Sequence, residues 1–399
     1  MILLVSNPNW HCEETAKFKV GKAFYNPESK LVRDLGVLAA RVYKQDYGSL
    51  RVLDALAGCG VRSLRYWQES DADYLWVNEG NPEHSSTLQQ NLSQAIGFAG
   101  ARRGASPLGR SAIAPNCYRI THQDAHRVFF SCYADRDYYD LVDVDCFGTA
   151  VPYINSMLWA TKIGGLIYLT ATDGRTLTGH LPENSIKAYG AIARSHPAAQ
   201  EQALRIIIGN TQQQAATKGL GIKPIFSLFT GKTYRLMMRL VAKPGLNDNN
   251  YGFITYCHSC GNYQTVGWRK LNQVSCKCHN PAITVSGAMW LGRLHDPQQI
   301  ERFTVLAQQL GWQKIVKLLG LMAGEIDLPP YFYTLREIGR RGKIDLPQRS
   351  HLIKALQDQS YQAAATHINP QGIKTNANLD TCIAIATQIS SSNHYSPNN

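Results

Sequence analysis

The fold class of this chain is decided by the stretch Arg51-Val52-Leu53-Asp54-Ala55-Leu56-Ala57-Gly58-Cys59-Gly60-Val61-Arg62. Its apolar first part predicts a buried strand over residues 51–57. Gly58 and Gly60 then predict a sharp turn into a helix, because glycine lets the backbone approach a ligand without a clash of Cβ. A strand that runs into a helix in this way is typical of crossover units, which build parallel sheets.

Strands alternate with segments of helical length in the chain that follows. The further predicted strands cover residues 74–79, 118–120, 138–144 and 165–170. Residues 222–229 and 234–241 flank a short turn-like spacer, which predicts a hairpin and therefore one antiparallel terminal strand. We expect an α/β fold with a Rossmann-like, doubly wound sheet.

A polar linker divides the chain into two expected domains. Residues 243–250 combine Pro, Gly and Asn with few apolar side chains, a composition typical of a solvated loop. We therefore expect one domain at residues 1–242 and a smaller α/β domain at residues 251–399. A second loop is predicted over residues 97–116, which are rich in glycine. It carries the basic side chains Arg102, Arg103 and Arg110.

The residues at the predicted strand ends indicate a nucleoside ligand. A dinucleotide-binding G-x-G-x-x-G motif would need glycine at position 63, where the chain has Ser63, so a pyrophosphate ligand is disfavoured. Glu79 follows the second strand, where an acid can hold both hydroxyls of a ribose. Asp124 follows the strand at residue 118 and can accept from an adenine amino group. Together they fit an adenosine without phosphates, such as S-adenosylmethionine.

The strand over residues 138–144 runs into a candidate catalytic loop, Asp145-Cys146-Phe147-Gly148. In open α/β sheets, ligands bind outside the carboxyl ends of the strands. The exocyclic amine of a nucleobase is a poor nucleophile, so its methylation needs a hydrogen-bond acceptor for the N–H. An aromatic face is also needed to hold the base outside its stack. Asp145 and Phe147 can supply these two groups.

These motifs resemble those of the tRNA (guanine(26)-N2)-dimethyltransferase family. The matching stretches are Phe24-Tyr25-Asn26-Pro27, Arg33-Asp34, Asp54 to Arg62, Asp143 to Gly148, Thr170 to Gly174 and Thr366 to Thr375. They occur in order over nearly the whole chain. The resemblance implies a class I methyltransferase fold, S-adenosylmethionine as the methyl donor and the N2 amine of a guanine in tRNA as the acceptor.

The resemblance also implies roles for individual residues. Asp145 would be the catalytic acceptor, and Phe24 and Phe147 would enclose the target guanine. The residues assigned to the donor site are Arg33, Asp54, Gly58, Gly60, Arg62, Glu79, Asp124 and Ala125. The family usually has proline between the Asp and the Phe, where this chain has Cys146. The rigidity of the loop is therefore in question, since proline would fix its φ angle.

Four cysteines in the second expected domain are arranged like a zinc knuckle. They are Cys257, Cys260, Cys276 and Cys278. Four thiolates form the closed tetrahedral site of structural zinc. The spacing C-x-C is unusual, and His279 could replace Cys278 as the fourth ligand.

Composition and charge limit the partners. The chain has 399 residues, 44% of them hydrophobic, and a formal net charge of +12, which suits a globular protein with a polyanionic partner. The basic stretch Arg336 to Lys354 is a candidate tRNA-docking surface. No apolar run reaches the length of a membrane span. We expect a cytoplasmic protein with no obligate protein partner.

Two other functions remain open at this point. One is methylation of a base amine in ribosomal RNA or DNA, although such enzymes typically resemble Asn-Pro-Pro-Tyr at the strand end. The other is a non-catalytic RNA-binding protein that retains the fold. The sequence does not decide whether one or two methyl groups are added.

Overall fold

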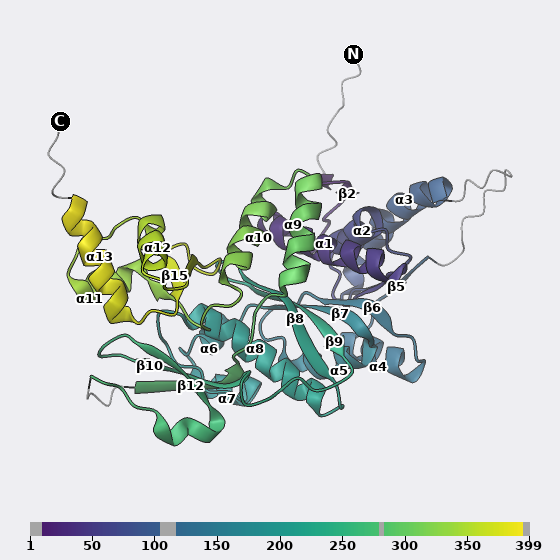
Figure 1. The fold of residues 1–399 in the computed structure, drawn as a ribbon. Helices are drawn as coiled ribbons and strands as arrows, with labels where there is room; N and C mark the ends of the chain where they lie inside the picture. The colour runs from purple at the N-terminus through teal and green to yellow at the C-terminus, as the bar shows by residue number, and fades with distance from the viewer. Residues whose placement is uncertain (1–9, 104–116, 279–282, 394–399) are drawn as a thin grey trace, which may run out of the picture.

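The computed structural model describes residues 10–103, 117–278 and 283–393. Its largest sheet has seven strands in the order β5-β4-β3-β6-β7-β9-β8 (Figure 1). Their bounds are β3 Arg51–Asp54, β4 Tyr74–Asn78, β5 Tyr118–Thr121, β6 Tyr139–Val144, β7 Thr161–Ala171, β8 Gly221–Phe229 and β9 Tyr234–Val241. The strands from β5 to β7 pair in parallel, and β9 is antiparallel to both β7 and β8. The α/β class, the hairpin and the antiparallel strand are confirmed.

Two layers of helices cover this sheet, as the doubly wound prediction requires. Successive strand residues point to opposite faces, so Val52 and Leu53 belong to different buried apolar clusters. One cluster contains helices α1 Lys30–Tyr47, α2 Val61–Glu69 and α3 Ser85–Arg103. The other contains α4 Ala125–Ala134, α5 Val151–Ala160 and α8 Ala199–Ala216. Two short helices, α6 Gly174–Leu177 and α7 Pro182–Tyr189, lie between β7 and α8 in the chain.

The N-terminal part of the chain adds short elements beside this sheet. They are the hairpin β1 His11–Glu13 and β2 Ala16–Phe18, and the 3-10 helices η1 Pro27–Ser29 and η2 Pro82–His84. Phe18 packs in the same apolar cluster as α1 and α2. The hairpin therefore lies over one helical layer of the sheet.

The chain after residue 250 has mixed α/β structure, as expected. One three-stranded antiparallel sheet contains β10 Tyr251–Cys257, β11 Tyr263–Gly267 and β12 Ile283–Trp290, with η3 Trp268–Gln273 after β11. A second contains β13 Tyr333–Thr334, β14 Ala363–Ala365 and β15 Gly372–Thr375. Helices α11 Leu335–Gly342, α12 Arg349–Asp358 and α13 Leu379–Asn393 accompany the second sheet, on the left of Figure 1.

Two helices that follow the linker pack against α1, which belongs to the first expected domain. Ile300 and Phe303 of α9 (Pro297–Gln309) and Leu319 of α10 (Gln313–Glu325) belong to the same apolar cluster as α1. Figure 1 shows both helices beside α1, apart from the C-terminal helices. Burial of these apolar side chains against α1 holds the segment there.

A buried ionic cluster joins strand β15 to helices α8 and α10. The Nζ atom of Lys374 on β15 lies 2.7 Å from Oε1 of Glu201 on α8 and 3.5 Å from Oε2 of Glu325 on α10. Arg205 is 2.7 Å from the same Glu201 oxygen. Because these groups are buried, removal of one partner would leave an uncompensated charge, so the junction fixes the three segments together.

The prediction of a loop over residues 97–116 is wrong at its start. Helix α3 continues through Gly97 and Gly100, the first two glycines of this region, to Arg103. The reason is the surrounding composition, since alanine and arginine favour the helix and each glycine costs only about 1 kcal/mol. Residues 104–116, which include Arg110, lie outside the described residues. Within the described ranges, no helix combines the length and apolar character of a membrane span.

Candidate active site and cysteine cluster

A cavity of about 460 Å³ lies at the carboxyl ends of the parallel strands. It is the position where open α/β sheets bind ligands. The predicted residues that line it are Phe24, Arg33, Gly58, Arg62, Glu79, Asp145 and Phe147. The structure thus brings the predicted donor and acceptor residues to one place. The predicted residues Asp54, Gly60, Asp124 and Ala125 are not among its lining residues.

The glycine turn needs its glycines for their backbone angles. Gly58 and Gly60 have φ angles of 56° and 81°, a region that side chains with a Cβ rarely adopt. The backbone N–H of Gly58 donates to Oε2 of Glu79 over 2.7 Å, and that of Asn81 donates to Oε1 over 2.9 Å. These bonds fix the Glu79 carboxylate at the cavity wall. Its remaining lone pairs can accept from a ligand.

Two arginines hold the carboxylate of Asp145. Nη2 of Arg62 lies 2.8 Å from Oδ2, and Nη1 of Arg235 on β9 lies 2.8 Å from Oδ1. Although burial opposes ionisation, these two guanidinium groups hold the pKa of Asp145 well below its usual range. Asp145 is therefore an anion at neutral pH. Its side chain is 29% exposed, which leaves part of the carboxylate open to the cavity.

Behind Asp145, Arg62 and Asp54 take part in a buried polar network. Nη1 of Arg62 donates to Asp143 over 3.1 Å, and the hydroxyl of Tyr66 donates to the same oxygen over 2.6 Å. Ser63 donates to Asp54 over 2.7 Å. Burial and the nearby Asp143 carboxylate raise the pKa of Asp54 to about 7. Asp54 is itself buried and accepts this bond from Ser63, in the first turn of α2.

The two predicted aromatic residues meet at the mouth of the cavity. The side chains of Phe24 and Phe147 are 68% and 71% exposed. Their ring centroids lie 5.1 Å apart with an angle of 77° between the planes, an edge-to-face contact. A nucleobase can enter between the rings only if they separate. Such exposed large apolar side chains at a cavity are typical of a binding surface.

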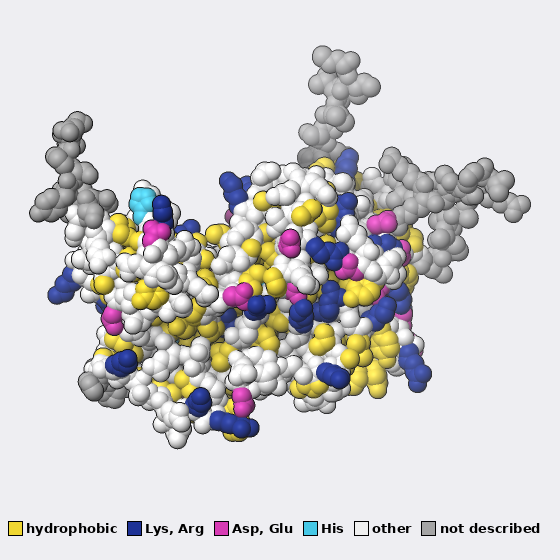
Figure 2. Space-filling model, in the orientation of Figure 1, with side chains coloured by type: hydrophobic (Ala, Val, Ile, Leu, Met, Phe, Trp, Pro, Cys, Tyr) yellow, Lys and Arg dark blue, Asp and Glu magenta, His cyan; other side chains and the backbone are white. Residues whose placement is uncertain are grey.

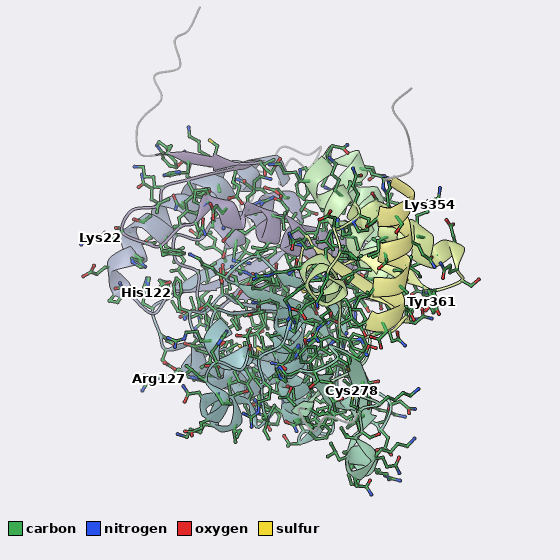
Figure 3. All side chains as sticks on the ribbon, turned by 90° about the vertical axis from the view of Figure 1, so that its left-hand side faces the viewer. Lys22, His122, Arg127, Cys278, Lys354 and Tyr361 are labelled. Atoms are coloured by element: carbon green, nitrogen blue, oxygen red, sulfur yellow. The ribbon has the colours of Figure 1, made fainter. Side chains whose placement is uncertain are left out.

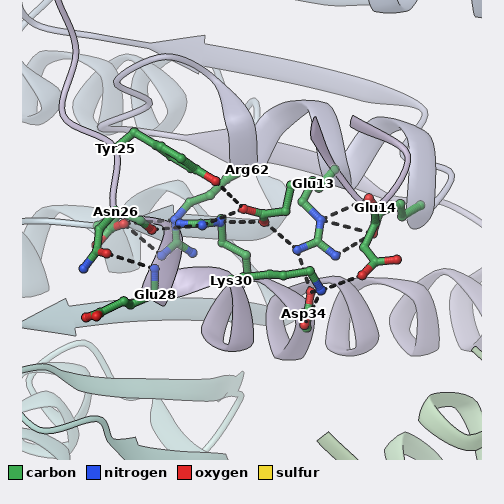
Figure 4. A network of polar contacts seen from close by, with 12 residues as sticks. Glu13, Glu14, Tyr25, Asn26, Glu28, Lys30, Asp34 and Arg62 are labelled. Carbon is green, nitrogen blue, oxygen red and sulfur yellow. Dashed lines mark hydrogen bonds and ion pairs between the residues drawn. The ribbon is translucent and has the colours of Figure 1, made fainter. Parts of the chain in front are cut away.

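Arg33 lines the cavity, and its guanidinium is bound by Glu13, a residue that the sequence analysis did not single out. Its guanidinium donates to the two carboxylate oxygens of Glu13 over 2.7 and 2.6 Å. Figure 4 shows Glu13 at the centre of a polar network that also includes Tyr25 and Asp34. Glu13 lies on β1, near the start of the described chain, where no motif marks it.

Asp124 and Ala125 begin helix α4. The Asp124 carboxylate accepts from the backbone N–H of His126 over 2.9 Å, which makes Asp124 the N-cap of this helix. Ala125 is the first helical residue and is buried. Both residues thus have a structural role in this arrangement, at the edge of the sheet that carries the cavity.

Cys146, at the position of the usual proline, is anchored by its thiol. The Cys146 S–H group is buried and donates to the carbonyl oxygen of Thr170 over 3.0 Å. The neighbouring Gly148 N–H donates to the hydroxyl of Thr172 over 2.7 Å. Burial, with the Asp145 charge nearby, raises the pKa of Cys146 to about 12, so the group stays a neutral thiol. These hydrogen bonds hold the loop where proline would have stiffened it.

The four cysteines converge as predicted. The Sγ atoms of Cys257 and Cys278 are 3.5 Å apart, those of Cys260 and Cys276 are 3.3 Å apart, and those of Cys276 and Cys278 are 3.2 Å apart. All four lie within 4.8 Å of one another. Four convergent sulfur donors fit the tetrahedral geometry of zinc. His279 lies outside the described residues.

The cysteine cluster lies far from the candidate active site. Figure 3 shows Cys278 in the lower right lobe, with Lys22 and His122 on the left side of the molecule. His122 marks the side of the active site, because its ring is hydrogen-bonded to the backbone oxygen of Glu79. Any metal at these cysteines would therefore be structural.

Within the predicted basic stretch, Arg340 and Arg341 differ. The guanidinium of Arg341 donates to the carbonyl oxygen of His258, over 3.0 Å, and to that of Ser259, both inside the Cys257-x-x-Cys260 turn. Arg340 contacts Glu337 over 3.0 Å and is 58% exposed, against 13% for Arg341. Arg341 is therefore part of the support for the cysteine turn. Arg336 and Lys343 are exposed.

The sheet order, the glycine turn and the cavity define a methyltransferase fold. The N2,N2-dimethylguanosine tRNA methyltransferase family model matches residues 9–387. The chain belongs to this family.

Individual relatives agree with this assignment. The tRNA (guanine(26)-N2)-dimethyltransferase of Pyrococcus abyssi is 28% identical over 369 residues, which are 91% of this chain and 92% of that protein. The protein of the same name from Pyrococcus horikoshii is 29% identical, with 92% of each chain covered. The solved structure of Trm1 from Pyrococcus horikoshii with S-adenosyl-L-methionine matches with a TM-score of 0.79 and 26% identity, over 94% of this chain and 99% of that chain.

Proposed function

We propose that this protein transfers methyl groups from S-adenosylmethionine to the N2 amine of guanine 26 in tRNA, first one and then a second. The observation that carries the proposal is the single cavity that joins Glu79, Asp145 and the exposed pair Phe24 and Phe147. The likeness to tRNA (guanine(26)-N2)-dimethyltransferases along most of the chain supports the choice of substrate.

Mass spectrometry of nucleosides tests this proposal. The purified protein should convert guanosine to N2,N2-dimethylguanosine in an unmodified tRNA transcript when S-adenosylmethionine is present. A ribosomal RNA fragment and a DNA duplex serve as controls and should stay unmodified. Donor binding without methylation of any of the three would overturn the proposal in favour of a non-catalytic RNA-binding protein.

The chemistry needs an anion beside the attacking amine. The lone pair of the guanine amine is delocalised into the ring, and S-adenosylmethionine supplies an activated methyl group. The ionised carboxylate of Asp145 accepts the N–H of the amine and stabilises the positive charge that develops on nitrogen. The rings of Phe24 and Phe147 hold the base by stacking, which is worth about 1–3 kcal/mol per base.

We assign the methyl donor to the part of the cavity between the glycine turn and Asp145. Glu79 would accept from the ribose hydroxyls, and Gly58 would allow close approach of the donor. Arg33 and Arg62 also line the cavity. For Asp54, Gly60, Asp124 and Ala125 we propose a supporting role, because they shape the turn and the start of α4 without lining the cavity.

Glu79 provides a direct test of the donor site. We expect Glu79→Ala to weaken binding of S-adenosylmethionine by about 1–3 kcal/mol, the effect of lost hydrogen bonds to a charged group. Glu79→Gln keeps an oxygen that can accept from the Gly58 N–H, so it controls for collapse of the turn. Isothermal titration calorimetry is the measurement. Equal donor affinity for the parent and both variants would exclude Glu79 from the donor site.

We propose that residues 251–399 form a tRNA-docking domain beside the methyltransferase domain of residues 1–242, and that the protein acts in the cytoplasm. The exposed Arg336, Arg340 and Lys343 support this proposal, because phosphate contacts position an RNA without reading its sequence. Figure 2 shows a hollow between the C-terminal elements and α10, and basic side chains gather near α9 and α1. We further propose that the four cysteines hold a structural zinc ion.

A further inference from the structure

Arg235 comes close to Asp145 through the topology of the sheet. Strand β9 runs antiparallel to β7, and this pairing sets Arg235 opposite Thr170. Asp145 directly follows β6, which is the other neighbour of β7. The Arg235 guanidinium therefore crosses the end of β7 to reach Asp145. Its Nη1 lies 2.6 Å from the Thr170 hydroxyl and 2.8 Å from Oδ1 of Asp145.

The two oxygens of Asp145 have different arginine partners. Arg235 binds Oδ1 from β9, and Arg62 binds Oδ2 from α2. Both guanidinium groups are buried, so the surrounding protein restricts their motion. A carboxylate held at both oxygens loses the rotation about its terminal bond, which is otherwise broad. The plane of the Asp145 carboxylate, and the direction in which it can accept an N–H, are thereby fixed.

We propose that Arg235 is a positioning residue for methyl transfer, which fixes the orientation of the Asp145 carboxylate as the acceptor for the guanine amine. This inference rests on the proposed function. As the sulfur–methyl bond breaks and the nitrogen–methyl bond forms, the amine nitrogen becomes positively charged. It returns to neutrality when one of its protons passes to water. Asp145 stays ionised throughout, because Arg62 and Arg235 face it from two sides.

The test compares two arginines on the same strand. Arg239 also lies on β9, but it donates to the carbonyl oxygen of Gly164 and to Tyr47. We expect Arg235→Ala to slow single-turnover methyl transfer roughly 100-fold, the effect of a misplaced reacting group. Affinity for S-adenosylmethionine should stay at the parent value. Arg239→Ala should retain the parent rate.

Chemical rescue separates positioning from a general effect on folding. Guanidinium chloride, at concentrations below those that unfold the protein, should restore part of the rate of Arg235→Ala and leave the rate of Arg239→Ala unchanged. Arg235→Lys keeps the positive charge and should be more active than Arg235→Ala. It also serves as the test variant if Arg235→Ala does not fold. A parent rate in Arg235→Ala, or in Arg235→Gln where the alanine variant does not fold, would overturn this inference. Failure of the parent to methylate tRNA would instead overturn the proposed function.

Discussion

Replacing Asp145 by asparagine should slow methyl transfer by roughly 10²- to 10⁴-fold, the range for a positioned acid–base or acceptor group. Asparagine keeps the shape and one acceptor oxygen but removes the charge. It would also leave Arg62 and Arg235 without their shared anion at the cavity. The developing charge on the amine nitrogen would then meet two cations and no carboxylate.

The measurement for Asp145 is single-turnover methyl transfer with saturating donor and tRNA. Affinities for S-adenosylmethionine and tRNA should remain close to the parent values, since the base is held by the Phe24 and Phe147 rings. The exposed Asp358 at the end of α12 gives a matched control, because Asp358→Asn makes the same charge change far from the cavity. A rate for Asp145→Asn close to that of the control would exclude Asp145 as the acceptor.

Loss of one cluster cysteine should remove zinc and destabilise the fold around β10 and β11. Binding of structural zinc is worth about 10–16 kcal/mol in small zinc modules at neutral pH, and this free energy is coupled to folding. We therefore expect Cys276→Ser to lower both the zinc content and the thermal midpoint of unfolding. Serine cannot provide the thiolate that completes the tetrahedral set.

Elemental analysis and differential scanning calorimetry check the zinc proposal. Cys12→Ser is the matched control, because Cys12 is exposed and far from the cluster in sequence. The parent and the control should each contain one zinc ion per chain and respond to a chelator. Parent protein without zinc, or a parent unfolding midpoint that a strong chelator does not change, would contradict the proposal.

The sequence predicted the parts of the fold that depend on local patterns. Apolar runs and turn residues predict the strand from Arg51, the turn at Gly58 and Gly60, and the hairpin before residue 242, and all are present. Glycine content predicts a loop from residue 97, but the helix continues to Arg103 because the neighbouring alanines and arginines favour it.

The missed site residues depend on contacts between distant segments. Arg235 meets Asp145 across 90 positions of sequence, and its place in the mostly buried strand β9 gives no motif. Glu13 meets Arg33 from a three-residue strand. Arg341 was grouped with the basic stretch, yet its side chain supports the Cys257 turn. In each case only the folded chain shows which partner an ordinary charged side chain has.

Other parts of the site are predictable from the sequence, because they depend on where strands end. Glu79 and Asp145 both follow strands of one parallel sheet, and the carboxyl ends of those strands lie at one edge. Phe24 could be assigned only through the resemblance to a family, since nothing in its local sequence predicts contact with Phe147. The structure brings the two rings together at the cavity.

Inosine provides the most direct test of whether the protein methylates the N2 amine of guanine 26. Inosine differs from guanosine by the absence of this amine. Two tRNA transcripts, identical except for guanosine or inosine at position 26, should be incubated with the protein and S-adenosylmethionine and analysed by nucleoside mass spectrometry. We expect N2,N2-dimethylguanosine in the first transcript and no methylation in the second. Equal methylation of both transcripts, or methylation of neither, would contradict it.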